Sequence, residues 1–169
     1  MEEIKIIILD VDGTMTDGKL YIDNNGVETK AFHVKDGMAI AQAVKHGVKI
    51  AIITGRTSKV VEHRAKELGI VDIYQGISNK IKTLDELLEK YGLTYENVAY
   101  MGDDINDIPA MMRSGYVGIP RDATEDIEEF AHFRSKYKGG QGAVREFIEG
   151  ILRENGIWDK IIEDYRNKK

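Results

Sequence analysis

The sequence predicts an α/β fold with a Rossmann-like, doubly wound parallel sheet, in a single domain over residues 1–169. Three mainly apolar runs, residues 5–9, 48–53 and 97–101, carry this prediction, and each is followed by polar residues. Continuous apolar runs of this length are typical of strands that helices cover on both faces. The segments between the runs have helical periodicity, as such an architecture requires. Because ligands bind beyond the carboxyl ends of parallel strands, the polar residues after the runs are the candidate site.

The first run leads into Asp10-Val11-Asp12-Gly13-Thr14. Asp10 and Asp12 are two residues apart, so their side chains point the same way while the chain is extended. Gly13 lets the backbone turn close to a ligand. Two crowded carboxylates repel each other unless a divalent cation lies between them or one keeps its proton. The alternative interpretation is a strand end at which Asp residues simply start a turn.

Residues 19–33 form a predicted small β-hairpin insertion, because two short β-like runs flank Asp23-Asn24-Asn25-Gly26, a turn suited to positive φ. A helix is predicted next, with Asp36 as its N-cap and Gly47 at its end. Its apolar positions are Met38, Ile40, Ala41 and Val44.

The second run ends in Thr54, and a helix is predicted from Ser58 to Leu68. Thr54 either caps this helix or binds a phosphoryl oxygen together with the helix amides. After a short predicted strand over residues 70–74, Lys80 opens a helix with an apolar face. A cation at a helix start opposes the helix dipole, which is understandable if an anion binds there. The alternative for Lys80 is a mobile surface lysine.

The third run leads into Gly102-Asp103-Asp104-Ile105-Asn106-Asp107. Carboxylate oxygens suit Mg²⁺, which takes only one or two protein carboxylates and fills its other positions with water and phosphate oxygens. Taken alone, this acidic loop has the alternative of being merely solvated.

The remaining residues predict further helices and strands but few candidate functional side chains. Met111 and Met112 are expected in the core. A strand is predicted over residues 115–120, a helix from about Thr124 to Phe130, and an extended piece from His132. A C-terminal helical tail is predicted over about residues 142–169, with its end docked through Trp158, Ile161 and Ile162. The segment Lys138–Gly142 has three glycines, and it is either a plain connector or a movable cover for the active site.

These motifs, in this order, resemble those of haloacid-dehalogenase-type (HAD) phosphatases. The resemblance implies that Asp10 attacks phosphorus to form an aspartyl-phosphate, which water then hydrolyses. Asp12 would act as general acid and then as general base. Mg²⁺ would offset the repulsion between the carboxylate and the phosphate.

The resemblance also implies the other roles. Thr54 would bind the phosphoryl group, and Lys80 would neutralise and orient it. The metal ligands would be Asp10, the backbone carbonyl of Asp12, and Asp103. Asp104 is expected to hold Lys80 or a metal-bound water, and Asp107 to start the next helix and support the site from behind. The candidate substrate-binding residues are Thr14, Thr16, Lys35, Gly55, Arg56 and Arg64. For Lys35, Arg56 and Arg64 the alternative is an ordinary solvated side chain.

Neither of the two places where family members insert a lid has room for one here, so the predicted fold is HAD-like and capless. Neighbouring subunits would then complete the site. Within the family, the first motif and residues 32–37, 53–56 and 139–146 resemble tetrameric phosphatases of sugar acid phosphates in bacterial lipopolysaccharide precursor synthesis. The predicted substrate is an eight-carbon 3-deoxy sugar acid 8-phosphate. The alternative is a nine-carbon acid 9-phosphate of the sialic acid or deaminated sialic acid type.

Other classes of protein fit less well. A non-enzymatic phosphoacceptor domain also uses a strand-end Asp, Mg²⁺, Thr and Lys, but it carries the acceptor on a middle strand of the chain. A scaffold with a silent site is disfavoured because every catalytic position is filled. A sugar-phosphate mutase needs a cap to retain its intermediate.

Composition restricts location and partners. The absence of cysteine excludes disulfides and cysteine nucleophiles and fits a reducing cytosol. We expect no removable signal and no membrane span, because the N-terminus is charged and the apolar runs are short. A net charge of -5 without a basic face argues against nucleic-acid partners. The expected protein is cytoplasmic, binds a small sugar phosphate and forms a homotetramer.

Overall fold

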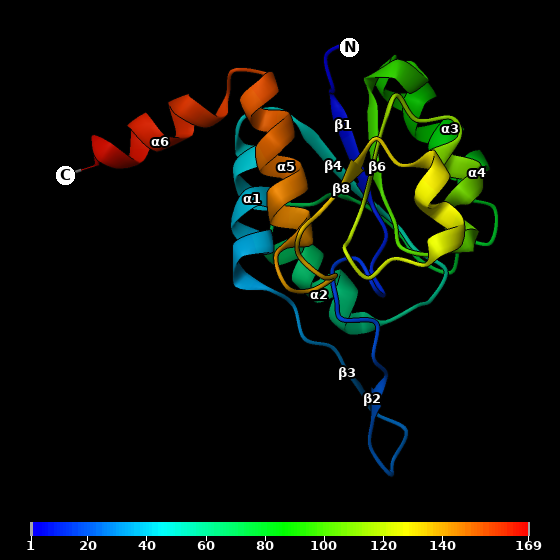
Figure 1. Cartoon of the computed structure of the whole chain (residues 1–169). Coiled ribbons are helices and arrows are strands. Elements are labelled where there is room, and N and C mark those ends of the chain that lie inside the picture. The colour runs from blue at the N-terminus through cyan, green and yellow to red at the C-terminus, as the bar shows by residue number, and fades with distance from the viewer. Residues whose placement is uncertain (1, 169) are drawn as a thin grey trace.

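The computed structural model describes residues 2–168, and a six-stranded parallel sheet lies at its centre (Figure 1). The strand order is β5-β4-β1-β6-β7-β8. The strands are β1 (Ile6–Leu9), β4 (Lys49–Ile53), β5 (Asp72–Tyr74), β6 (Val98–Met101), β7 (Tyr116–Ile119) and β8 (Phe133–Arg134). β1 pairs in parallel with β4 on one side and β6 on the other, with Ile8 opposite Ala51 and Tyr100. The predicted doubly wound parallel sheet is confirmed.

Helices cover both faces of this sheet, and β1 shows why its sequence is continuously apolar. Ile7 and Leu9 pack with α1 (Val34–Lys45), α2 (Lys59–Glu67) and α5 (Ala143–Glu154). Ile6 and Ile8 face the opposite side, against α3 (Lys80–Tyr91) and α4 (Ile108–Met111). All four β1 side chains are fully buried, so no position of the strand tolerates a polar residue until the chain leaves the sheet at Asp10.

The hairpin projects from one end of the sheet (Figure 1). It pairs β2 (Tyr21–Ile22) with β3 (Glu28–Thr29) in antiparallel fashion. The predicted turn is present: Gly26 has φ of 76°, and its amide donates to the carbonyl of Asp23 at 3.0 Å. The hairpin exposes apolar side chains, namely Leu20, Tyr21, Ile22 and Val27.

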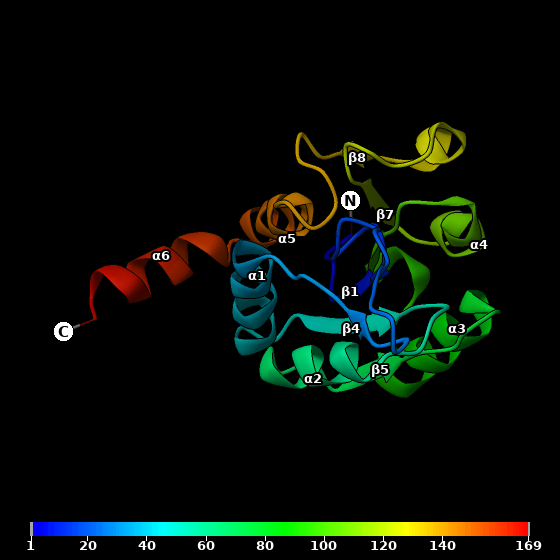
Figure 2. The ribbon, with the colours of Figure 1, turned by 90° about the horizontal axis from the view of Figure 1, so that it is seen from below.

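The start of α1 differs from the prediction. Its N-cap is His33, whose Nδ1 accepts from the amide of Lys35 at 3.2 Å, and Asp36 lies inside the first turn. Asp36 instead accepts from the backbone amide of Arg145 at 2.9 Å. Because Gly142, the N-cap of α5, has no side chain, Asp36 caps α5 from the neighbouring helix. Figure 2 shows α1 and α5 side by side, as this contact requires.

The C-terminal half departs from prediction in three further places. Met111 is buried as expected, but Met112 is 67% exposed, because α4 is only four residues long and Met112 follows it on the solvent side. In α6 (Trp158–Arg166), Trp158 and Ile161 are buried while Ile162 is 38% exposed. The helix expected near Thr124 is a 3₁₀ helix, Glu125–Phe130, and two more 3₁₀ turns span Tyr95–Asn97 and Ile105–Asp107.

The last helix, α6, extends away from the sheet and its covering helices (Figures 1 and 2). Within residues 2–168, every helix is too short or too polar to cross a membrane.

Candidate active site

The carboxyl ends of the three central strands bring the predicted motifs to one cavity of about 190 Å³. Asp10 follows β1, Thr54 follows β4, and Asp103 follows β6 after one glycine. The amide of Asp10 continues the sheet by donating to the carbonyl of Met101 at 3.0 Å. The residues lining the cavity are Asp10, Asp12, Thr54, Gly55, Arg56, Asp103, Asp104 and Asn106. Segments far apart in the chain therefore meet where a parallel sheet binds its ligands.

Lys80 enters the site from the first position of α3. Its Nζ lies 3.3 Å from Oδ1 of Asp10 and 2.7 Å from Oδ1 of Asp107, and its side chain is 3% exposed. The interpretation of Lys80 as a mobile surface lysine is therefore wrong. Burial acts to lower the pKa of Lys80, but Asp10 and Asp107 outweigh it, so the pKa is raised and the ammonium keeps its charge. Asn79 caps the helix by accepting from the amide of Lys82 at 3.2 Å.

Asp107 holds this end of the site together and has no free oxygen. Its Oδ1 accepts from Lys80 and from the hydroxyl of Tyr100 at 2.6 Å. Its Oδ2 accepts from the amides of Asp103 at 3.0 Å and Asp104 at 3.3 Å. A Cβ at position 102 would lie 2.3 Å from Cγ of Asp107, which explains the glycine that opens the motif. Asp107 therefore supports the site from behind.

Asp104 does not hold Lys80, contrary to one of its two expected roles. Its Oδ1 accepts from the amide of Ile105 at 2.7 Å, as the N-cap of a 3₁₀ turn. Its other expected role, contact with a metal-bound water, stays a prediction.

Tyr100 was not predicted as part of the site. It is fully buried, and burial raises the pKa of its hydroxyl well above the ordinary value, so it acts as a donor. A tyrosine within a buried apolar run was the available signal, because a buried phenol needs a hydrogen-bond partner.

The carboxylates around the cavity are crowded, and a bound cation would offset the repulsion between them. Oxygens of Asp10, Asp103 and Asp107 lie within 4.8 Å of one another. Burial, followed by repulsion from Asp107, raises the pKa of Asp10 to about 6. Burial, followed by repulsion from Asp10, raises the pKa of Asp103 to about 8. Since the oxygens of Asp107 are already used, Asp10 and Asp103 are the carboxylates suited to hold a hard divalent cation.

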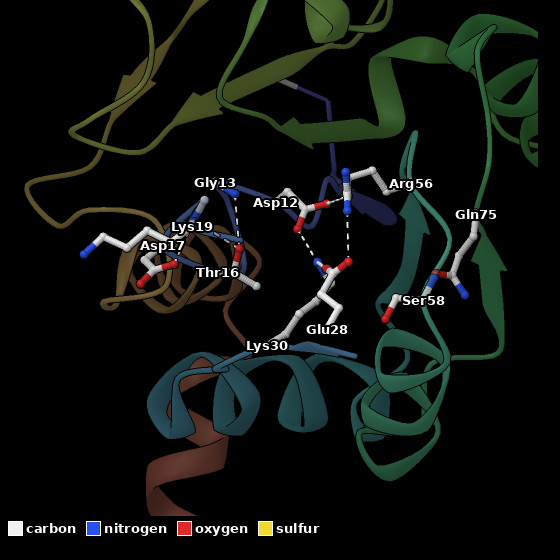
Figure 3. A network of polar contacts seen from close by, with 11 residues as sticks. Asp12, Gly13, Thr16, Asp17, Lys19, Glu28, Lys30, Arg56, Ser58 and Gln75 are labelled. Atoms are coloured by element: carbon white, nitrogen blue, oxygen red, sulfur yellow. Dashed lines mark hydrogen bonds and ion pairs between the residues drawn. The ribbon is translucent and has the colours of Figure 1, made fainter. Parts of the chain in front are cut away.

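Asp12 lies at the mouth of the same cavity, within a ring of charges that the sequence did not predict (Figure 3). Nζ of Lys30 is 2.5 Å from Oδ1 of Asp12 and 2.5 Å from Oε1 of Glu28. Nη2 of Arg56 is 2.9 Å from Oε2 of Glu28, and its Nε is 3.9 Å from Oδ2 of Asp12. No sequence pattern identified Lys30 or Glu28, because only the folded hairpin brings them beside Asp12.

Thr14 and Thr16 shape the loop after β1 and do not line the cavity. Both are buried, and Oγ1 of Thr16 accepts from the amides of Gly13 at 3.3 Å and Gly18 at 3.2 Å. The hydroxyl of Thr14 has no hydrogen-bond partner within residues 2–168. A contact of either hydroxyl with substrate stays a prediction.

Lys35 and Arg64 also lie outside the cavity, whereas Gly55 and Arg56 line it. Arg64 packs against Gly37, and its Nη1 is 3.2 Å from Oε2 of Glu67. Lys35 is exposed and lines a different hollow, beside Arg145. A substrate contact by Lys35 or Arg64 stays a prediction, because neither side chain lines the cavity within this chain.

The glycine-rich segment packs backbone to backbone against the loop that follows Asp12. The amide of Gly140 donates to the carbonyl of Thr14 at 3.1 Å, and the amide of Gly139 donates to Oδ1 of Asp122 at 3.0 Å. A Cβ at Gly139 would lie 1.9 Å from the carbonyl oxygen of Gly13. None of residues 138–142 lines the cavity. In this structure the glycines permit close approach behind the loop and cover no part of the cavity.

Comparison with known proteins agrees with this geometry. The haloacid dehalogenase-like hydrolase family matches residues 31–115. The 3-deoxy-D-manno-octulosonate 8-phosphate phosphatase KdsC of Escherichia coli (strain K12) is 45% identical over 159 residues, which are 94% of this chain and 85% of the relative.

Two solved structures extend the comparison. The 3-deoxy-D-manno-octulosonate 8-phosphate phosphatase of Moraxella catarrhalis, in complex with magnesium ion, phosphate ion and KDO, has a TM-score of 0.93 and 38% identity, covering 96% of this chain and 93% of that one. The cobalt-bound deoxy-D-mannose-octulosonate 8-phosphate phosphatase of Haemophilus influenzae has a TM-score of 0.88 and 35% identity, covering 92% and 91%.

Proposed function

The chain belongs to the haloacid dehalogenase-like hydrolases, and from this membership we propose that it is a Mg²⁺-dependent phosphatase that hydrolyses 3-deoxy-D-manno-octulosonate 8-phosphate to KDO and inorganic phosphate. The observation that carries the proposal is the meeting of Asp10, Asp12, Asp103 and the buried Lys80 at one small cavity. The similarity to phosphatases of this sugar acid extends over nearly the whole chain and supports the choice of substrate. The reaction would contribute to lipopolysaccharide precursor synthesis.

Catalysis would proceed in two steps that use the two carboxylates of the first motif. In the first, an oxygen of Asp10 bonds to phosphorus while the bond from phosphorus to the sugar oxygen breaks, and Asp12 gives its proton to that oxygen. In the second, water attacks the aspartyl-phosphate, Asp12 takes a proton from the water, and the bond between phosphorus and Asp10 breaks. Lys80 holds Asp10 in place and carries positive charge beside the reacting oxygens.

The residues that would hold Mg²⁺ are Asp10, Asp103 and the backbone carbonyl of Asp12. Their oxygens fit this cation by type, and the raised pKa values of Asp10 and Asp103 mark the negative charge that it would offset. When bound, the cation supplies the charge that lets a carboxylate approach a phosphate. Thr54 lines the same cavity and would donate its hydroxyl to a phosphoryl oxygen, and Arg56 at the mouth would meet the sugar acid.

The test is phosphate release from a panel of sugar phosphates in the presence of Mg²⁺. We expect the highest kcat/KM for 3-deoxy-D-manno-octulosonate 8-phosphate and complete, reversible loss of activity in excess EDTA. A higher kcat/KM for a nine-carbon acid 9-phosphate of the sialic acid type would move the substrate to that class. Failure to release phosphate from any member of the panel would overturn the proposed activity.

The proposed assembly is a homotetramer in which the hairpin packs against another subunit. Four apolar hairpin side chains, Leu20, Tyr21, Ile22 and Val27, are between 44% and 58% exposed, which supports their burial in an interface. The cavity is small and open, so a neighbouring subunit would also help to exclude water. Light scattering at assay concentration should give four chains. A fully active monomer would contradict this assembly.

Two broader features are part of the proposal. Residues 1–169 would act as one domain, since the sheet collects strands from β1 to β8 and α5 packs against α1. The enzyme would work in the cytoplasm, where a chain without cysteine has no need of disulfides.

A further inference from the structure

We propose that Lys30 is a positioning residue that holds Asp12 for proton transfer, so that the hairpin supplies part of the catalytic machinery of its own chain. This inference rests on the proposed phosphatase function and adds a residue to it. The evidence is the placement of Lys30, which leaves the hairpin and turns inward to Asp12 (Figure 3).

The burial of Lys30 is the first argument. Its side chain is 2% exposed although the hairpin itself is largely exposed to solvent. A lysine ammonium is costly to bury without carboxylates around it. Lys30 has two such partners, Asp12 and Glu28, each with an oxygen 2.5 Å from Nζ. Glu28 in turn is held by Arg56, so Lys30 has a fixed position.

The second argument is that the two oxygens of Asp12 have different contacts. Lys30 binds Oδ1, while Oδ2 accepts no hydrogen bond within residues 2–168 and lies 3.9 Å from Nε of Arg56. Asp12 lines the cavity, so one oxygen is anchored and the other is available to the substrate. A general acid must lie within hydrogen-bond distance of the oxygen that it protonates. The ion pair with Lys30 keeps the carboxylate in one orientation for this purpose.

The test compares two substrates that differ in their need for a general acid. The alkoxide of a sugar phosphate needs a proton as it leaves, whereas p-nitrophenolate leaves without one. The variant is Lys30→Met, which keeps the length of the side chain and removes the ammonium. The matched control is Lys19→Met at the same hairpin, because Lys19 is exposed, points away from Asp12 in Figure 3 and forms no salt bridge within residues 2–168.

We expect Lys30→Met to lower kcat/KM about 100-fold for the sugar phosphate and less than about 3-fold for p-nitrophenyl phosphate, since general acid catalysis typically contributes this much. The ratio kcat/KM reports steps up to formation of the aspartyl-phosphate, so slow hydrolysis of the intermediate does not affect it. That slow hydrolysis should appear separately, as a burst of p-nitrophenol. Lys19→Met should behave like the wild type with both substrates.

A double-mutant cycle tests whether Lys30 acts through Asp12. Adding Lys30→Met to Asp12→Asn should change kcat/KM less than about 2-fold, because the residue that Lys30 orients has lost its function. An equal loss for both substrates, or a full further loss in the double variant, would overturn the proposal, since Lys30 would then support the phosphoryl group or the fold. A rise in KM alone, with kcat unchanged, would also overturn it.

Two controls keep the result interpretable. If circular dichroism shows that Lys30→Met does not fold, Lys30→Gln takes its place, because it also removes the ammonium and its shorter side chain ends before the position of Nζ, and the same substrate ratio decides. If the wild type does not hydrolyse 3-deoxy-D-manno-octulosonate 8-phosphate, the proposed substrate is wrong. The role of Lys30 is then tested with whichever alkyl phosphate of the panel the enzyme hydrolyses.

Discussion

Asp10 and Asp12 are two residues apart, yet they lie in charge networks of opposite character. Behind Asp10, Lys80, Asp107 and Tyr100 form a network in which every side chain is at least 96% buried. Beside Asp12, Lys30 is buried, but Glu28 and Arg56 have side chains that are 21% and 49% exposed. The first network comes from strand and helix ends of the sheet, and the second comes from the hairpin.

The two networks therefore differ in rigidity, although they belong to one active site. A buried network is strong and costly to break, because a lost partner leaves an uncompensated charge. A half-exposed ion pair contributes little to stability and can rearrange. The core therefore fixes Asp10, the proposed nucleophile, and the buried Lys30 anchors Asp12. Arg56, the proposed contact for the sugar acid, is half-exposed and can adjust to the substrate.

The largest effect is expected at Asp10, the proposed nucleophile. Asp10→Asn should lower kcat about 10⁴-fold or more and leave the fold intact, because the amide keeps the shape of the carboxylate but cannot attack phosphorus. Phosphate release measures the loss, and circular dichroism checks the fold. Residual activity above a few per cent of wild type would exclude Asp10 as nucleophile.

Removal of a member of the buried network should affect both stability and turnover. Asp107→Asn removes the negative charge that Lys80 pairs with and replaces one of the two acceptor oxygens by an NH2 donor, so we expect a loss of about 3–5 kcal/mol in the free energy of unfolding. Turnover should fall as well, since the remaining oxygen can serve either Lys80 and Tyr100 or the amides of Asp103 and Asp104, but not both pairs. Denaturant unfolding with parallel assays gives both values. Wild-type stability in this variant would mean that the network is not essential to the fold.

The support behind the loop after Asp12 can be disturbed without changing a charge. Gly139→Ala places a methyl group against the carbonyl of Gly13, and a displacement of about 1 Å there should cost about 100-fold in kcat. Gly150→Ala in α5 is the matched control, because its Cβ would contact nothing within 4 Å. The control should keep wild-type kinetics and gain about 0.5–1 kcal/mol of stability. Unchanged kinetics in folded Gly139→Ala would make the segment an ordinary connector.

The crowded carboxylates predict how stability depends on pH and Mg²⁺. Without a cation the pKa is about 6 for Asp10 and about 8 for Asp103, so the folded state binds more protons than the unfolded state, whose carboxylates titrate near 4. The free energy of unfolding should therefore fall as pH rises from about 4 to 8 in EDTA, by on the order of a few kcal/mol.

Mg²⁺ should remove most of this fall, so the difference in Tm between Mg²⁺ and EDTA should widen toward pH 8. Calorimetry across this range measures the difference, and Asp103→Asn is the control that should flatten it. A pH-independent difference in the wild type would show that these carboxylates are not the cation site.

The smallest effect is expected in the half-exposed network. Glu28→Gln removes the charge shared by Lys30 and Arg56, and we expect a change of less than about 1 kcal/mol in stability, since Arg56 is half-exposed. Lys30 keeps its partner Asp12, so kcat/KM should stay within about 10-fold of wild type. A loss of stability as large as that of Asp107→Asn would abolish the distinction between the two networks.

The parts of the site that the sequence predicted are those that depend on local pattern. Uninterrupted apolar runs identify strands covered on both faces, and parallel strands bring their carboxyl ends together, so Asp10, Thr54 and Asp103 were expected to meet. Lys80 was expected for a similar reason, because a cation at a helix start needs a partner charge. The resemblance to haloacid-dehalogenase-type phosphatases then supplied the roles.

Only the tertiary structure decided the contacts between segments that lie far apart in the chain. Lys30 beside Asp12, Gly139 against Gly13, and Asp36 as the cap of α5 depend on how the hairpin and the C-terminal segment fold back onto the sheet. Periodicity reports which face of an element is buried, but it carries no information about which distant residue lies opposite. That pairing is set by packing of the whole chain, where backbone distance and available hydrogen-bond partners select among many locally equivalent side chains.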